Sequence, residues 1–305
     1  MLDQFLLARY PGDSNERIKV REFVQILCRR HIELELGDPN FESNLCSGSE
    51  ARYWQFLSEA ILGHELLDAG LEVQPSRDGP DFLVMHEGRK IWIEVICPEP
   101  TGVPENWLGH EPNRRVTFPH EAILLRWASA IKEKTEKLLG NPEKMKLGYL
   151  KKGVVGPDDS YVIAVNGRLL RGVLNGLMGI SQHPFAVEAV FAVGPYQIKI
   201  DRASLKVTEG GHQHRPTISK PIGLPVPVST FLDSAFQTVS AIWATDIDDC
   251  WVIGNTKQMT VVHNPIATNP IPERFLPATS EYVASACEDG EYLLANIQGR
   301  LNNAD

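Results

Sequence analysis

Two acids, Asp81 and Glu94, have the best surroundings for chemistry in this sequence. Asp81 follows Gly79 and Pro80, and Glu94 lies within the apolar run IWIEVI at residues 91–96. Burying such an acid is costly unless its charge is paired or binds a metal. Carboxylate oxygens suit Mg²⁺ or Mn²⁺, and a bound ion can activate water for attack on a phosphodiester. An alternative stays open, in which Asp81 only opens a turn and Glu94 pairs with an arginine.

The elements that position these acids form a predicted hairpin. Alternating or short apolar runs predict strands at residues 71–73, 81–85 and 90–97. Residues 86–89 (HEGR) form the expected turn between the last two strands. The hairpin places one acid at the start of a strand and the other near the end of the next, so their carboxylates can converge.

Helical periodicity surrounds these strands. It predicts helices over residues 16–35, over a segment capped by Ser47, Gly48 or Ser49 and ended by Gly70, and over residues 120–139. A buried strand is expected at residues 160–166 (SYVIAVN). Residues 47–166 therefore run helix, three strands, helix, strand.

These residues resemble the PD-(D/E)xK, or restriction-endonuclease-like, nuclease superfamily. Pro80-Asp81 is similar to its first motif, Glu94 to the acid of its second, and Glu59 to a further acid on the preceding helix. The superfamily core also runs helix, three strands, helix, strand. The pattern GPDF…IWIE, followed by a helix with Arg and Lys, is similar to an uncharacterised bacterial branch. The resemblance implies an α/β fold, a Mg²⁺ or Mn²⁺ cofactor and hydrolysis of nucleic acid.

One motif residue departs from the superfamily, because the usual lysine two residues after the second acid is replaced by Ile96. Lys90 lies on the same strand face as Glu94, since side chains alternate along a strand. Arg126 and Lys134 lie on a broadly shared side of the following helix. We expect Lys134 to supply the charge, because that helix packs near the site in the superfamily fold. A solvated lysine is the alternative.

Composition limits the kind of nucleic-acid contact. The chain has 305 residues, 43% hydrophobic and 23% charged, with a formal charge of -9. Binding along a DNA backbone needs Lys and Arg, so any contact must be local. Residues 126–152 hold eight basic and three acidic side chains, about +5. A solvated helix face is the alternative for this segment.

The sequence divides into three parts. We predict an N-terminal helical segment at residues 1–46, a nuclease-like core at 47–167, and a mixed α/β extension at 168–305 that could continue the same sheet. Strands are expected in the extension at the following segments: residues 186–193, 198–200, 240–244 and 259–262.

Other reactive side chains have weaker patterns. His212 and His214 form an HxH pair without a third ligand, and a glycine-rich loop is expected there. A solvated loop is expected for Asp246, Asp248 and Asp249, although acids in such a cluster can hold a divalent ion. The five cysteines have no CxxC spacing, which disfavours disulfides and a zinc knuckle. No apolar run of about 18 residues and no signal peptide is evident, so a cytoplasmic protein without a membrane partner is expected.

Two hypotheses follow. In the first, the chain is a Mg²⁺-dependent DNA nuclease in which Asp81 and Glu94 hold the ion and Glu59 assists through water. Lys134 or Lys90 supplies the positive charge. In the second, it is a catalytically silent member of the same fold that binds nucleic acid or a protein partner.

Overall fold

A computed structural model describes residues 1–76, 78–109, 115–172, 176–220, 222–254, 257–287 and 292–303. Its centre is an eight-stranded mixed sheet in the order β1-β2-β3-β6-β11-β12-β13-β14. These strands are β1 (Glu72–Pro75), β2 (Phe82–His86), β3 (Arg89–Ile96), β6 (Ser160–Asn166), β11 (Ala241–Thr245), β12 (Met259–His263), β13 (Ser280–Ala286) and β14 (Tyr292–Gln298).

The middle of the sheet is parallel. β6 pairs in parallel with β3 on one side and with β11 on the other. Every residue of β6 is buried, which is typical of a parallel strand covered on both faces. Antiparallel pairing joins β1 to β2, β2 to β3, β11 to β12 and β13 to β14, whereas β12 and β13 are parallel. The strands of the C-terminal third therefore continue the sheet begun by β1–β3.

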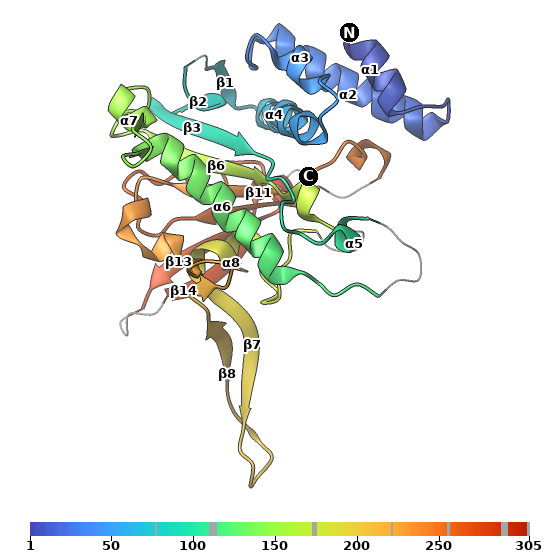
Figure 1. Cartoon of the computed structure of the whole chain (residues 1–305). Helices are drawn as coiled ribbons and strands as arrows, with labels where there is room; N and C mark the ends of the chain where they lie inside the picture. Colours follow the sequence, from blue (N-terminus) through green and yellow to red (C-terminus); the bar gives the residue numbers. More distant parts are fainter. Residues whose placement is uncertain are drawn as a thin grey trace.

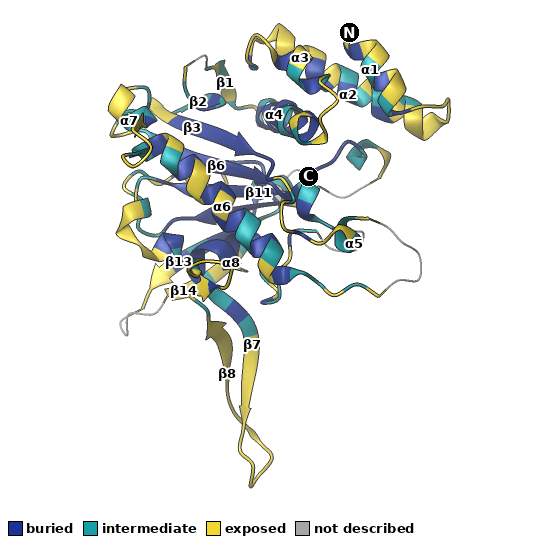
Figure 2. Cartoon of the chain, viewed as in Figure 1, coloured by how far each residue is buried: buried dark blue, intermediate teal, exposed yellow. Residues whose placement is uncertain are grey.

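Two layers of helices cover this sheet (Figure 1). One face carries α1 (Leu2–Arg9), α2 (Asn15–Glu33), α3 (Phe41–Leu45) and α4 (Glu50–Asp68). The other carries α6 (His120–Leu139) and α8 (Phe185–Phe191). In Figure 2 the central strands are dark blue and the outer side of α6 is yellow, so α6 is amphipathic.

Shorter elements complete the chain. The remaining helices are α5 (Glu105–Leu108), α7 (Tyr149–Lys152), and the 3₁₀ helices η1 (Gly167–Leu170), η2 (Thr230–Leu232), η3 (Ser234–Phe236), η4 (Trp251–Ile253) and η5 (Arg300–Asn303). Two-stranded ribbons are formed by β4 (Gly140–Asn141) with β5 (Lys146–Leu147), β7 (Val193–Ile200) with β8 (Val207–His214), and β9 (Thr217–Ile218) with β10 (Val226–Pro227). The β7–β8 ribbon projects from the body and is largely exposed (Figures 1 and 2).

The α/β class predicted from the sequence is confirmed. The longer elements also follow the predicted order of helix, three strands, helix and strand, with the short α5, β4, β5 and α7 inserted before β6. α6 and β6 have the predicted bounds. Ser49 is the residue that caps α4, where its Oγ accepts from Arg52 N at 3.4 Å. The β2–β3 turn has positive φ at Glu87 (49°) and Gly88 (78°), as a type I′ hairpin requires. β11 and β12 confirm two of the strands expected in the C-terminal third, and β7 contains a third.

One predicted strand is wrong, because residues 186–193 are largely the helix α8. All seven residues of α8 are buried, so the segment has no polar face from which a period could be read. Helix is selected by tertiary context: Glu188 accepts from the backbone nitrogen of Ser181 at 2.7 Å and contacts His120.

His31 of α2 is buried in the core without a polar partner. It is 2% exposed, and within the described residues neither ring nitrogen has a hydrogen-bond partner. Its ring lies 4.6 Å from that of Phe41 and 6.1 Å from that of Phe82. This burial lowers the pKa of His31 to about 4. The folded protein therefore holds His31 as neutral imidazole.

This burial predicts a pH dependence of stability. Between about pH 6.5 and pH 4 the unfolded chain binds a proton at His31, whereas the folded chain does not. The free energy of unfolding is therefore highest above about pH 6.5 and falls as the pH is lowered to about 4. We expect this group to contribute a loss of about 3 kcal/mol over that window. Urea unfolding of the wild type and of His31→Phe across this range measures it. The variant should lose less stability than the wild type, and the exposed control His214→Ala should follow the wild type; parallel curves for all three proteins would contradict the prediction.

Candidate active site

Glu94 is a buried acid on the inner part of the sheet. It lies near the end of β3, opposite Ile163 of β6, and is 1% exposed. Side chains alternate along a strand, so Glu94 points to the same face as Trp92, which is the face that α6 covers. Its Oε1 accepts hydrogen bonds from Lys134 Nζ at 2.8 Å and Lys137 Nζ at 2.7 Å.

The two lysines reach Glu94 from one side of α6. They are three residues apart, and such positions share a helix face. Lys134 is 5% exposed, whereas Lys137 extends to the surface. Burial opposes the charged form of Lys137, but the Glu94 carboxylate outweighs it and raises the pKa of this lysine above its ordinary value. Two ammonium groups therefore balance one buried carboxylate.

A second pair of acids lies close to Glu94. Asp81 precedes β2, and its Oδ2 accepts from Val95 N at 2.5 Å. Burial and then the negative charge of Glu94 raise the pKa of Asp81 to about 7, although Lys134 opposes the shift. Burial and then the charge of Asp81 raise the pKa of Glu59, on α4, well above its ordinary value. The carboxyl groups thus lie near enough to resist ionising together.

Gln55 connects α4 to the end of β3. Its Nε2 donates to Glu59 Oε1 at 2.9 Å and to Val95 O at 3.2 Å, and its Oε1 accepts from Cys97 N at 2.9 Å. The amide therefore fixes the carboxylate of Glu59 against the same strand that carries Glu94.

Among the basic side chains considered from the sequence, the structure brings Lys134 to Glu94. Lys90 is exposed near the start of β3, opposite Met85. Arg126 instead donates through Nε to Glu99 O at 2.7 Å. Ile96 is 8% exposed and packs in the apolar cluster beneath α6. A lysine charge therefore reaches Glu94 from the helix α6 and not from its own strand.

Three contacts of this site were not predicted from the sequence: those of Lys137, Tyr149 and Gln55. The position of Lys137, three residues after Lys134, was a usable signal. Tyr149 begins α7, and its hydroxyl donates to Glu94 Oε2 at 3.4 Å. Gln55 lies four residues before Glu59 on α4, a local spacing that could have marked it, whereas nothing local marks Tyr149, which reaches Glu94 through tertiary packing.

The acids of this site fit a divalent ion that prefers oxygen. Burial first, and the charge of a neighbouring acid second, raise the pKa values of Asp81 and Glu59, and a bound cation would favour their ionised forms. Both lysines bind Oε1 of Glu94, and among the residues that the structure describes the contact given for its Oε2 is the long one with Tyr149. Asp81 and Glu94 are therefore the residues that would hold the ion.

Within the described chain, only Asp248, Asp249 and Cys250 bring three metal-binding atoms within 4.8 Å of one another. Glu59 is thus not a third ligand of a compact set with Asp81 and Glu94.

The expectation of a solvated loop at Asp246, Asp248 and Asp249 is wrong, because each is no more than 6% exposed. Arg171 Nη1 lies 3.1 Å from Asp246 Oδ2, and its Nη2 contacts Asp248. Asp249 accepts from the hydroxyl of Tyr10. Arginine pairing and a phenol therefore offset part of the cost of burying these acids, although Asp246 Oδ1 has no hydrogen-bond partner among the described residues.

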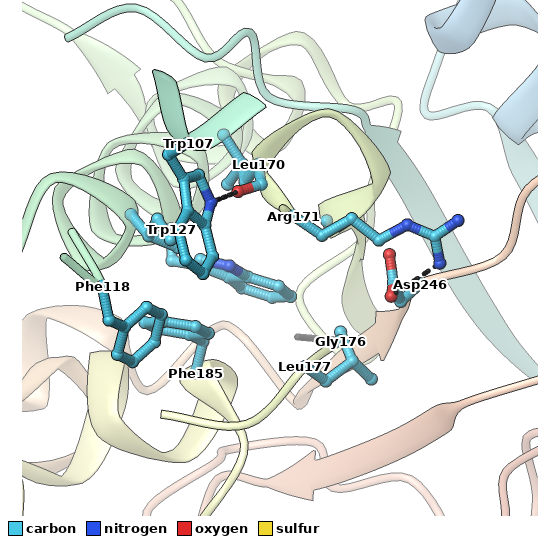
Figure 3. Close-up of a pocket in the computed structure, with 11 residues that line it drawn as sticks. Trp107, Phe118, Trp127, Leu170, Arg171, Gly176, Leu177, Phe185 and Asp246 are labelled. Atoms are coloured by element: carbon cyan, nitrogen blue, oxygen red, sulfur yellow. Dashed lines mark hydrogen bonds and ion pairs between the residues drawn. The ribbon is translucent and has the colours of Figure 1, made fainter. Parts of the chain in front are cut away.

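Asp246 also lines a narrow aromatic pocket (Figure 3). Trp107, Phe118, Trp127 and Phe185 form much of its wall, and Trp107 Nε1 donates to Leu170 O at 3.0 Å. The cavity volume is about 10 Å³. This is room for about one water molecule, so the pocket is too small for a substrate.

The HxH pair lies on strand β8, which corrects the expected glycine-rich loop. His212 Nδ1 lies 3.0 Å from Gly194 O, and its ring lies 4.9 Å from that of His183. Among the described residues, no set of three metal-binding side chains includes His212 or His214.

Comparison of the chain with protein-family models, with curated proteins and with solved structures finds no match. None of the helices in the described ranges has the length and apolar character needed to span a bilayer.

The Glu94–lysine contacts predict a strong coupling in stability. Lys134→Met should destabilise the fold by about 3 kcal/mol, because it leaves a buried carboxylate with one ammonium group instead of two. Adding Glu94→Leu to this variant should restore part of the loss, since apolar replacements of a buried pair are often neutral. Urea unfolding of both single variants and the double variant measures the coupling, which we expect to exceed about 1 kcal/mol.

Lys132→Met on the exposed side of α6 is the matched control and should change stability by no more than about 0.5 kcal/mol. Strict additivity of the two substitutions would contradict the coupling.

Proposed function

We propose that this chain is a Mg²⁺- or Mn²⁺-dependent phosphodiesterase with a restriction-endonuclease-like core, and that its substrate is DNA. The observation that carries the proposal is the 2.8 Å contact between Lys134 Nζ and Glu94 Oε1. This contact places the ammonium group of Lys134, which lies on α6, beside the acid. In the superfamily motif the corresponding lysine lies on the same strand as the acid. The arrangement of α4, β1–β3, α6 and β6, with β3 and β6 parallel, supports the same core.

The side chains divide the chemistry among them. Asp81 and Glu94 would hold the ion, which when bound supplies Lewis acidity at the phosphate. Glu59, held by Gln55, would accept the proton of an attacking water in its ionised form, which a bound cation would favour against the burial that raises its pKa. As the water oxygen bonds to phosphorus, the bond to the leaving sugar oxygen would break, that oxygen would take a proton from solvent water, and Lys134 would stabilise negative charge on the phosphate.

A second candidate function is a catalytically silent protein of this fold that binds nucleic acid. It is favoured by the pairing of Glu94 with both Lys134 and Lys137, because these contacts stabilise the buried acid without any metal. Metal binding and cleavage separate the two functions.

Calorimetry tests the first requirement. Titration with Mn²⁺ should show binding to the wild type and no measurable binding to Asp81→Ala, since one of the two proposed carboxylate ligands is lost. Asp158→Ala, which removes an exposed acid, is the control and should bind as the wild type does. Absence of Mn²⁺ binding by the wild type would exclude the nuclease function and leave the silent binding protein.

Cleavage tests the second requirement. Plasmid, linear duplex, single-stranded DNA and RNA are incubated with the wild type and Mg²⁺ or Mn²⁺. Glu94→Gln and Lys134→Met should each slow cleavage by on the order of a hundredfold or more, because each removes charge next to the reacting phosphate. Lys132→Met should cleave at the wild-type rate. Equal cleavage by Lys134→Met and wild type would overturn the role of Lys134, and preferential cleavage of RNA would overturn the choice of DNA.

A further inference from the structure

A basic groove lies beside the candidate active site. Its volume is about 670 Å³, and four lysines line it against Glu133 and Glu136. The lysines are Lys137, Lys144, Lys146 and Lys152. Lys137 and Tyr149 line this groove and also contact Glu94, so the groove and the candidate site are continuous.

The β4–β5 ribbon that forms one wall is held firmly against the end of α6. Gly140 has a φ of 90°, which favours glycine. A Cβ atom on Gly148 would lie 2.2 Å from Gly140 N and 2.3 Å from Leu138 O. Only glycine allows the two backbone segments to approach this closely, so the ribbon starts from a fixed position.

The turn between β4 and β5 is also fixed by its own hydrogen bonds. Asn141 Oδ1 accepts from Lys144 N at 3.1 Å, and Asn141 Nδ2 donates to Glu136 Oε2 at 3.0 Å. Met145 N donates to Pro142 O at 3.1 Å. The backbone of the turn is therefore held in a defined conformation.

Met145, at the tip, has two unfavourable features at once. It is 92% exposed, and its φ of 51° is a left-handed conformation that is costly for a residue with a side chain. Lysines precede and follow it in the sequence, at positions 144 and 146. An exposed apolar side chain between two cations suits a ligand that offers both negative charge and apolar faces.

Resting on the proposed function, we propose that the groove and the β4–β5 turn hold a strand of the DNA substrate. Phosphates lie along Lys144, Lys146 and Lys152, and Met145 inserts against the bases. Nucleic acid has this combination of regularly spaced phosphates and stacked apolar bases, and inserted methionine is a known way to part a base step. The formal charge of -9 confines such binding to a local basic surface.

Binding is measured apart from cleavage, by fluorescence anisotropy of a fluorescein-labelled DNA duplex with the full chain in EDTA. Lys144→Gln/Lys146→Gln should weaken binding by about tenfold and lower the salt dependence of log K by about two, because each phosphate contact contributes about one. Lys199→Gln/Lys206→Gln, on the β7–β8 ribbon, is the matched control and should bind as the wild type does. An equal loss in both variants, or no loss in either, overturns the groove.

The role of Met145 is tested with 2-aminopurine placed within the duplex. Wild-type binding should raise its fluorescence as the base unstacks, and Met145→Ala should abolish this rise while weakening affinity only a few-fold. Leu205→Ala is the control, since Leu205 is 80% exposed and also has a positive φ, 54°. No rise with the wild type, or an unchanged rise with Met145→Ala, overturns the insertion.

The two proposals fail in different ways. If DNA binding depends on Lys144 and Lys146 but no metal supports cleavage, the groove is kept as a DNA-binding site and the nuclease function is rejected. If the wild type cleaves DNA and the lysine substitutions change neither the rate nor the affinity, the nuclease function is kept and the groove is rejected as the DNA-binding site.

Discussion

The negative charge of Glu94 within the sheet constrains much of the surrounding structure. A lone carboxylate at this depth would be strongly disfavoured, because the interior solvates charge poorly. Lys134 and Lys137 compensate it, and this requires α6 to present one face over β3 at a fixed rotation and distance. The same position of α6 also allows its apolar face to pack against β3 and β6. The ion contacts and the apolar packing therefore depend on each other.

The carboxyl groups of the chain are stabilised in two contrasting ways. Asp246 and Asp248 both contact the guanidinium group of Arg171. Asp81 lies instead among other acids, and its pKa is raised to about 7 by burial and by Glu94. Burial also raises the pKa of Asp246 to about 6, so the two sites differ in the group that faces the acid: an arginine at Asp246, and a second acid besides the lysines at Asp81.

Much of the fold was predictable because its central elements have strong periodic patterns. α6 combines an apolar face with a clear end at Gly140, and β6 is an uninterrupted apolar run, so their bounds followed from local sequence. α8 is buried on all sides, and only its tertiary surroundings select helix over strand. At the site, Asp81 and Glu94 were evident from residue type and context. Tyr149 was not, because its contact with Glu94 spans fifty-five positions along the chain.

The β7–β8 ribbon has a consequence for the dynamics of the molecule. Each strand has eight residues, a length of about 25 Å, and most of its side chains are exposed. A ribbon of this kind gains little apolar burial of its own, since isolated two-stranded ribbons are marginally stable in water. Its backbone amides should therefore exchange with solvent deuterium through local opening, well before those of β6, whose exchange requires the whole sheet to come apart.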